Sequence, residues 1–71
     1  MKQVVISTPY ITLGQLLKRT GVIDTGGQAK HYLAEHVVLV NETREDRRGK
    51  KLKAGDIITL EDGTRFEIVA K

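Results

Sequence analysis

The chain has 71 residues, a net charge of +3 at neutral pH and no cysteine. A chain of this length forms one small domain, so residues 1–71 are expected to make a single domain with little room for an enclosed active site. Without cysteine, a disulfide framework and a cysteine-based metal site are excluded, and no apolar run is long enough for a signal peptide or a membrane span, so a cytoplasmic protein is expected.

The first predicted elements are a strand and a helix. Lys2–Ile6 contains a run of β-branched residues that favours a strand, and Pro9 follows it, where a ladder cannot continue. Thr12 is a good N-cap for a helix, because the side chain of Gln15 can reach back to the N–H of the cap. The apolar stripe of this helix consists of Leu13, Leu16 and Leu17. Gly21 is expected to end the helix as a left-handed cap.

Residues 25–41 predict a second short helix that leads into a strand. Thr25 and Gln28 repeat the Thr-x-x-Gln pattern of the first helix. The predicted buried stripe consists of Ala29, Tyr32 and Leu33. Gly26 and Gly27 lower helix propensity by roughly 1 kcal/mol each relative to alanine. Two explanations for the glycine pair stay open: a tight turn, or the close approach of another backbone or a ligand.

The remaining strands predict the fold class. Val37–Val40 is apolar on both faces, so this strand is expected to be covered from two sides. Asn41 is expected to be a turn residue. Ile57–Leu60 and Arg65–Val69 predict a hairpin across an Asp-Gly turn. Two helices with a short connection pack as a helix-turn-helix pair. The predicted class is therefore α+β, with two packed N-terminal helices against a small, mainly antiparallel β-sheet.

Positive charge is concentrated between Arg44 and Lys53, where six basic residues face only Glu45 and Asp46. The segment Arg44–Lys51 is predicted to be an exposed hairpin arm or loop. A run of charges is often only a solvated face. Contact with a polyanion is the other interpretation, because the outer surface of the helix pair also carries basic residues, namely Lys18, Arg19 and Lys30.

Several short segments follow a known pattern. They are Gly21, Gly26-Gly27-Gln28-Ala29, Leu33, Val38-Leu39-Val40-Asn41 and Lys53-Ala54-Gly55-Asp56-Ile57. These segments resemble the alpha-L RNA-binding motif of the S4 domain family, over a motif core of about residues 12–60. The Gly-Gly-Gln-Ala-Lys and Arg-Arg-Gly-Lys-Lys-Leu segments are most similar to the small stand-alone bacterial members of the YaaA type.

The chain departs from this family pattern in several places. Thr12 stands where arginine often opens the first helix, Thr25-Gly26 replaces a Ser-Arg pair, and His36 replaces a glycine. Because two guanidiniums are absent, the resemblance implies phosphate contact through backbone N–H groups and Lys30. Asn41-Glu42 replaces an Asn-Gly turn, which puts Glu42 at a position where a type I′ turn needs positive φ.

The resemblance implies a non-catalytic protein that binds structured RNA, ribosomal or similar, in ribosome assembly or translation. Recognition is expected to depend on shape and phosphate, because the chain lacks a row of aromatic residues for stacking unpaired bases. The helix-pair face and the basic arm are predicted to contact RNA through Thr12, Gln15, Lys18, Thr25, Gly26, Gly27, Gln28, Lys30, His31, Arg44, Arg47, Arg48, Lys50 and Lys51.

Other functions are weighed against RNA binding. A small protein–protein adaptor that docks through its apolar strand or sheet edge is the alternative. An enzyme is not expected, because the chain has no constellation of acids, nucleophile and metal ligands, and no cofactor, metal or small-molecule substrate is predicted. A monomer without a membrane partner is expected. Tyr10 and Tyr32 are predicted to pack inside the protein and not to stack on bases.

Overall fold

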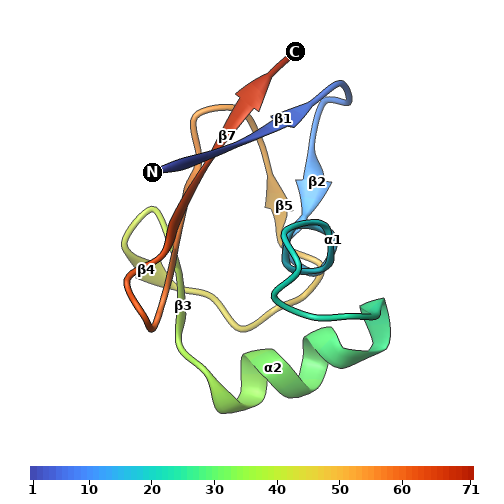
Figure 1. Cartoon of the computed structure of the whole chain (residues 1–71), viewed down its shortest axis with the longest axis vertical. Coiled ribbons are helices and arrows are strands. Elements are labelled where there is room, and N and C mark those ends of the chain that lie inside the picture. Colours follow the sequence, from blue (N-terminus) through green and yellow to red (C-terminus); the bar gives the residue numbers. More distant parts are fainter.

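The first and last strands of the chain lie side by side in the computed structural model, which describes residues 1–71 (Figure 1). β1 (Lys2–Ile6) pairs in parallel with β7 (Arg65–Ala70), with Val4 opposite Ile68. The other pairs of this sheet are antiparallel, and its strand order is β1-β7-β6-β3-β4. The inner strands are β6 (Ile57–Leu60) and β3 (Val38–Val40), and the far edge is β4 (Thr43–Arg44). The predicted α+β class with a mainly antiparallel sheet is confirmed.

A second, two-stranded sheet was not expected from the sequence. β2 (Ile11–Thr12) pairs antiparallel with β5 (Lys51–Leu52), and Ile11 lies opposite Leu52. This short ladder brings the end of the basic segment next to the start of the first helix. Thr12, which the sequence predicts only as a helix cap, therefore also lies opposite Lys51 in a β-ladder.

The helical elements follow β2 in the chain. They are α1 (Leu13–Arg19), a 3₁₀ turn η1 (Gly26–Gln28) and α2 (Ala29–Glu35). Figure 1 shows α1 end-on while α2 runs across the bottom of the molecule, so the two axes cross steeply. Neither helix has the length and apolar character that crossing a membrane requires.

The end of α1 is a complete C-terminal cap. Gly21 has φ of +82°, and its N–H donates to the carbonyl of Lys18 at 3.1 Å. The N–H of Val22 donates to the carbonyl of Leu17 at 2.9 Å, and Val22 packs against the core. This pair of bonds is the Schellman motif, and it satisfies carbonyls that the helix leaves without partners. The predicted left-handed cap at Gly21 is confirmed.

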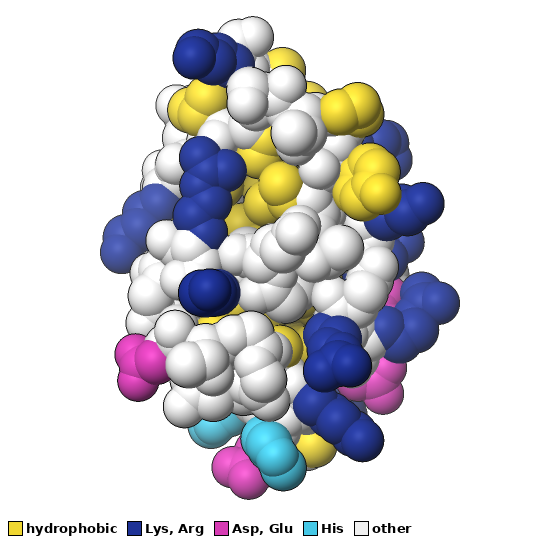
Figure 2. Space-filling view, turned by 90° about the vertical axis from the view of Figure 1, so that its right-hand side faces the viewer, with side chains coloured by type: hydrophobic (Ala, Val, Ile, Leu, Met, Phe, Trp, Pro, Cys, Tyr) yellow, Lys and Arg dark blue, Asp and Glu magenta, His cyan; other side chains and the backbone are white.

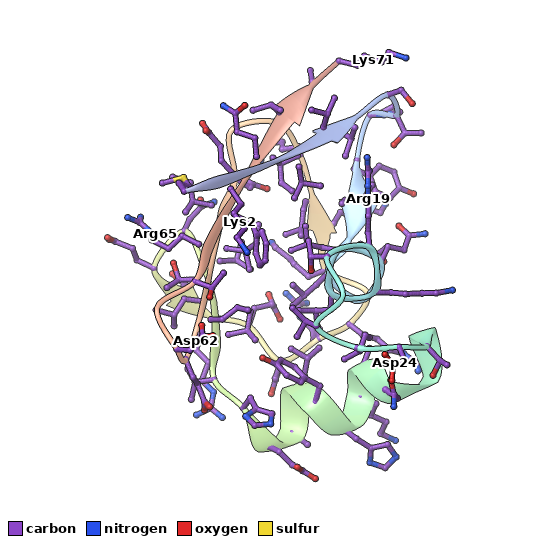
Figure 3. The ribbon with its side chains drawn as sticks, viewed as in Figure 1. Lys2, Arg19, Asp24, Asp62, Arg65 and Lys71 are labelled. Carbon is purple, nitrogen blue, oxygen red and sulfur yellow. The ribbon has the colours of Figure 1, made fainter.

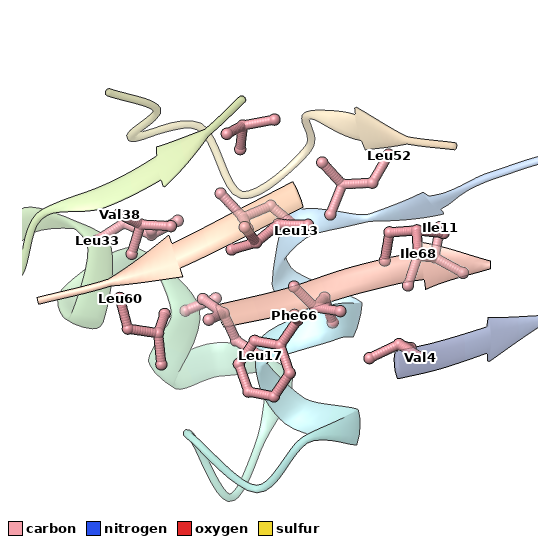
Figure 4. Close-up of a cluster of buried hydrophobic side chains, with 14 of the residues drawn as sticks. Val4, Ile11, Leu13, Leu17, Leu33, Val38, Leu52, Leu60, Phe66 and Ile68 are labelled. Atoms are coloured by element: carbon pink, nitrogen blue, oxygen red, sulfur yellow. The ribbon is translucent and has the colours of Figure 1, made fainter. Parts of the chain in front are cut away.

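The core lies between the helices and one face of the sheet (Figure 4). The buried side chains of the sheet alternate along the strands and include Val4, Ile6, Val38, Val40, Ile58, Leu60, Phe66 and Ile68. The helices cover them with Leu13, Leu16, Leu17, Ala29 and Leu33. The predicted stripes of both helices are therefore confirmed, with Tyr32 half-buried at the edge of this core.

Two burial predictions are wrong. Val37 lies outside β3 and is exposed, and Leu39 is only half-buried, so β3 is covered on one face and not on two. An antiparallel sheet can keep one face in water, and this small chain has no element left to cover the second face. Tyr10 lies outside the core, with 44% of its surface exposed.

The turn between β3 and β4 keeps positive φ at both central residues, +51° at Asn41 and +70° at Glu42, as a type I′ turn requires. The Asn41 amide donates to Asp56 at 3.0 Å and accepts from the N–H of Ile57 at 2.9 Å. Asn41 is thus a turn residue, as predicted. Burial acts to raise the pKa of Asp56, but hydrogen bonds from the Lys53 N–H and Asn41 outweigh it and lower the pKa.

Candidate nucleic-acid interface

The start of α1 is closed by its own side chains. The N–H of Thr12 donates to Oε1 of Gln15 at 2.8 Å, and the N–H of Gln15 donates to Oγ1 of Thr12 at 3.3 Å. This reciprocal pair is the capping box that the sequence predicts. Both side chains therefore have a structural role, and each also lies at the surface next to a groove.

The basic loop, residues 45–50, is fastened to the same helix end. The N–H of Leu13 donates to the carbonyl of Lys50 at 2.8 Å, and the N–H of Gly14 donates to the carbonyl of Arg48 at 2.9 Å. These are N–H groups that the first turn of a helix leaves without internal partners. Most residues of the loop are exposed, as predicted, and the two bonds hold the loop against the start of α1.

Gly14 is where the basic loop and both helices meet. A Cβ at this position would lie 3.4 Å from the Cβ of Ala29 in α2 and 3.4 Å from the carbonyl oxygen of Arg48. A methyl group would just fit in this space, but a branched side chain would push the three segments apart. The sequence analysis passed over this residue, although a glycine inside a helical pattern that is neither cap nor turn is a known signal of close packing.

The start of the second helix is built differently. The predicted helix opens as the 3₁₀ turn η1, and α2 begins at Ala29. Oε1 of Gln28 accepts from the N–H of Thr25 at 3.1 Å and from that of Asp24 at 2.6 Å. The N–H groups of Gly26 and Gly27 donate to no acceptor in the protein.

No internal constraint requires the two glycines of this turn. Neither Gly26 nor Gly27 has positive φ, and a Cβ on Gly26 would meet no atom within 4 Å. A Cβ on Gly27 would make only an ordinary contact of 3.9 Å, with Oγ1 of Thr25. The 3₁₀ turn therefore requires glycine at neither position, through neither backbone conformation nor space.

Two connected grooves collect most of the predicted residues. The central groove, of about 400 Å³, lies between α1, the η1 turn and the basic loop. It is lined by the predicted residues Thr12, Gln15, Lys18, Gly26 and Arg48, together with Gly14, Ala29 and Gly49. The loop groove, of about 420 Å³, shares Gly49 with it and is otherwise lined by Arg47, Lys50 and Lys51.

A third cavity, the upper hollow, adjoins the central groove at Gln15. Its volume is about 760 Å³, and it lies between β1, the turn that joins β1 to β2, and α1. The sequence analysis did not single it out. Its two cations are Arg19 from α1 and Lys71 from the end of the chain, and the pairing of β1 with β7 brings these two residues together.

The lining of these three cavities has one sign of charge. It includes seven of the twelve Lys and Arg residues and none of the nine Asp and Glu residues. Figure 2 looks onto this side of the molecule, where Lys and Arg side chains surround a hollow with a hydrophobic floor. No group of three His, Cys, Asp or Glu side chains is placed to hold a metal ion. A surface of this kind attracts anions.

One cation of the basic loop is already paired. The guanidinium of Arg47 donates twice to the carboxylate of Glu45, at 3.0 and 3.2 Å, and its backbone N–H donates to the same carboxylate at 3.1 Å. These bonds lower the pKa of Glu45 to about 2, so the carboxylate is charged at neutral pH. Arg48 and Lys50 form no such pair, and their side chains are the available cations of the loop.

Other predicted residues lie apart from the grooves. Lys30 and His31 are exposed on α2, and Thr25, Gly27 and Gln28 flank Gly26 without lining the central groove. Arg44 lies in β4 at the far edge of the sheet and lines none of the three cavities.

Comparison with known proteins agrees with the resemblance stated from the sequence. Residues 4–69 match the family model described as the S4 domain. The chain is 50% identical over 64 residues to the probable ribosome maturation protein RlbA of Bacillus subtilis (strain 168). That match covers 90% of this chain and 90% of the relative. The family match begins within β1 and ends within β7, so it extends beyond the predicted motif core on both sides.

Proposed function

This chain belongs to the S4 domain family, and we propose that it is a non-catalytic RNA-binding protein that acts in ribosome maturation. The observation that carries the proposal is the set of three connected cavities, lined by cations and by no carboxylate side chain. The relative named as a probable ribosome maturation protein supports structured ribosomal RNA as the partner.

The whole chain acts as one RNA-binding domain in this proposal. Its two N-terminal helices pack as the alpha-L motif, with Gly14 of α1 next to Ala29 of α2. The helix pair and the basic loop then present one continuous face to the RNA. The protein works as a cytoplasmic monomer without a cofactor, and recognition depends on the shape of the RNA and on its phosphates.

The cations of this face have unequal roles. Arg48 and Lys18 line the central groove without an acidic partner, so they supply the main phosphate contacts. Arg47 contributes less, since Glu45 already holds its guanidinium. The unpaired N–H groups of Gly26 and Gly27 donate to a phosphate oxygen at the rim of the same groove.

The salt dependence of binding tests this proposal. Replacing Lys18 and Arg48 by glutamine removes two charges from the central groove while each side chain keeps its bulk. We expect weaker binding to ribosomal RNA and a salt slope that is flatter by about 1 to 2 units, since each phosphate contact contributes about 0.7–0.9. Arg65→Gln is the control, because Arg65 is exposed in β7 and lines none of the three cavities that make up this face.

Two results would contradict the proposal. Equal effects of Arg65→Gln and of the groove variants would mean that only net charge matters. A shallow salt slope of the unmodified protein, with no preference for RNA, would favour the protein–protein adaptor. The open outer face of the sheet, where Leu39 is only half-buried, would then be the docking surface to examine.

A further inference from the structure

The upper hollow combines an apolar floor with a cationic rim. Its lining includes the apolar residues Val5, Pro9 and Ile11 and the side chain of Tyr10. Most of the chain's large apolar side chains are buried in the core, whereas Val5 and Tyr10 are exposed in this open cavity. A phosphate group alone would gain no binding energy from the apolar side chains of this cavity. A ligand with an apolar flat part beside a negative part fits both features.

Tyr10 provides an aromatic surface within this cavity. Its side chain lines the hollow and is 44% exposed, and Nζ of Lys51 lies 4.9 Å from the centroid of its ring. The lysine occupies one face of the ring and holds it in place. The other face is available for a second planar group.

Two more cations are positioned at the rim. The Arg19 guanidinium donates to the carbonyl of Val5, which fixes its orientation. Figure 3 shows the Arg19 side chain extending from α1 alongside β2, and Lys71 at the end of β7 above it. The N–H of Lys71 donates to the carbonyl of Ile6 at 2.9 Å, so the end of β7 is held beside the hollow. No Asp or Glu side chain lines this cavity.

We propose that the upper hollow binds an unpaired nucleobase of the RNA whose phosphates lie in the central groove. This inference rests on the proposed RNA-binding function. Gln15 lines both cavities, so the hollow adjoins the groove along the path of a bound strand. The base stacks on Tyr10 over the apolar floor, and Arg19 and Lys71 contact the flanking phosphates. The ligand is therefore a structured RNA with an unpaired nucleotide next to a helix, and not a fully paired duplex.

Two short RNA hairpins test the inference, one with a blunt end and one with the same stem and a tail of unpaired adenosines. We expect the unmodified protein to bind the tailed hairpin about five- to tenfold more tightly, the effect of stacking one base on an aromatic ring. Tyr10→Ala should abolish this difference and leave binding of the blunt hairpin unchanged. Tyr10→Phe keeps the ring and should keep the difference.

The outcomes separate this inference from the proposed function. If the unmodified protein binds both hairpins equally, the nucleobase site is wrong and RNA binding stands. If it binds neither hairpin, both proposals are wrong. If Tyr10→Ala weakens binding of both hairpins by the same factor, Tyr10 acts on the general interface and the nucleobase site is again overturned. A circular dichroism spectrum of each variant confirms that it is folded, as expected for a change at an exposed residue.

Discussion

The two helix starts of this protein carry the same local sequence pattern and end in different structures. Thr12 and Gln15 close the start of α1, and the basic loop occupies the next two N–H groups. Thr25 and Gln28 open a 3₁₀ turn instead, and the N–H groups that follow Thr25 have no acceptor in the protein. The pattern Thr-x-x-Gln thus specifies where a helix begins, and the surrounding chain decides whether its N–H groups are used internally or stay available.

The glycines next to each cap differ in the same way. Gly14 is in contact with α2 and with the basic loop, and a Cβ there would be tightly confined. Gly26 and Gly27 have space around them and ordinary φ. The first glycine therefore serves packing within the protein, whereas the pair is free to serve a ligand.

The largest expected effect comes from exchanging glycine for valine at each start. Gly14→Val should destabilise the protein by about 1–3 kcal/mol, because the side chain overpacks the contact with Ala29 and Arg48. Gly27→Val should leave the free energy of unfolding nearly unchanged and weaken RNA binding, because the side chain blocks access to the N–H groups. Urea unfolding and RNA titration of both variants measure the two quantities.

A stable Gly14→Val variant would show that the three segments can separate at little cost. A Gly27→Val variant that binds RNA as tightly as the parent would remove the phosphate role of the glycine pair. A Gly27→Val variant that fails to fold would restore the tight-turn explanation.

The next effect concerns the cap of α1. Thr12→Ala removes the oxygen that accepts from the N–H of Gln15 and should cost about 0.5–2 kcal/mol of stability. For a domain of this size that loss lowers the melting temperature by several degrees. Thermal unfolding followed by circular dichroism measures it, with Thr20→Ala at the other helix end as a comparison. An unchanged melting temperature would mean that the capping box is not significant for stability.

The smallest expected effect is the difference in stability between variants of the two capping glutamines, Gln15 and Gln28. Oε1 of Gln28 accepts two backbone hydrogen bonds, and Oε1 of Gln15 accepts one. Gln28→Ala should therefore cost about 0.5 kcal/mol more than Gln15→Ala, the low end for one hydrogen bond because these groups are exposed. Parallel urea unfolding of the two variants provides the difference. The reverse order would show that the η1 turn is the weaker of the two helix starts.

Much of the local structure follows from short-range patterns. The caps at Thr12 and Gly21, the buried stripes of both helices and the hairpin between β6 and β7 were all predicted, because each depends on residues within a few positions of one another. The family was also recognisable from glycine and strand spacing. The assignment of RNA contacts to individual residues stays a prediction, and the grooves show only which of them share a surface.

Long-range contacts decided the rest. Nothing near Gly14 in the sequence indicates that the carbonyl of Arg48 will accept its N–H, and nothing near Arg19 indicates that Lys71 will lie at the same cavity. These long-range contacts follow from two strand pairings. β1 pairs in parallel with β7, and β2 forms a short antiparallel ladder with β5. The sequence by itself determined the two caps of α1, the hairpin between β6 and β7, and the apolar faces of the two helices. Only the tertiary structure decided which N–H groups and cations were left for a ligand, because that depends on which distant segments the core draws together.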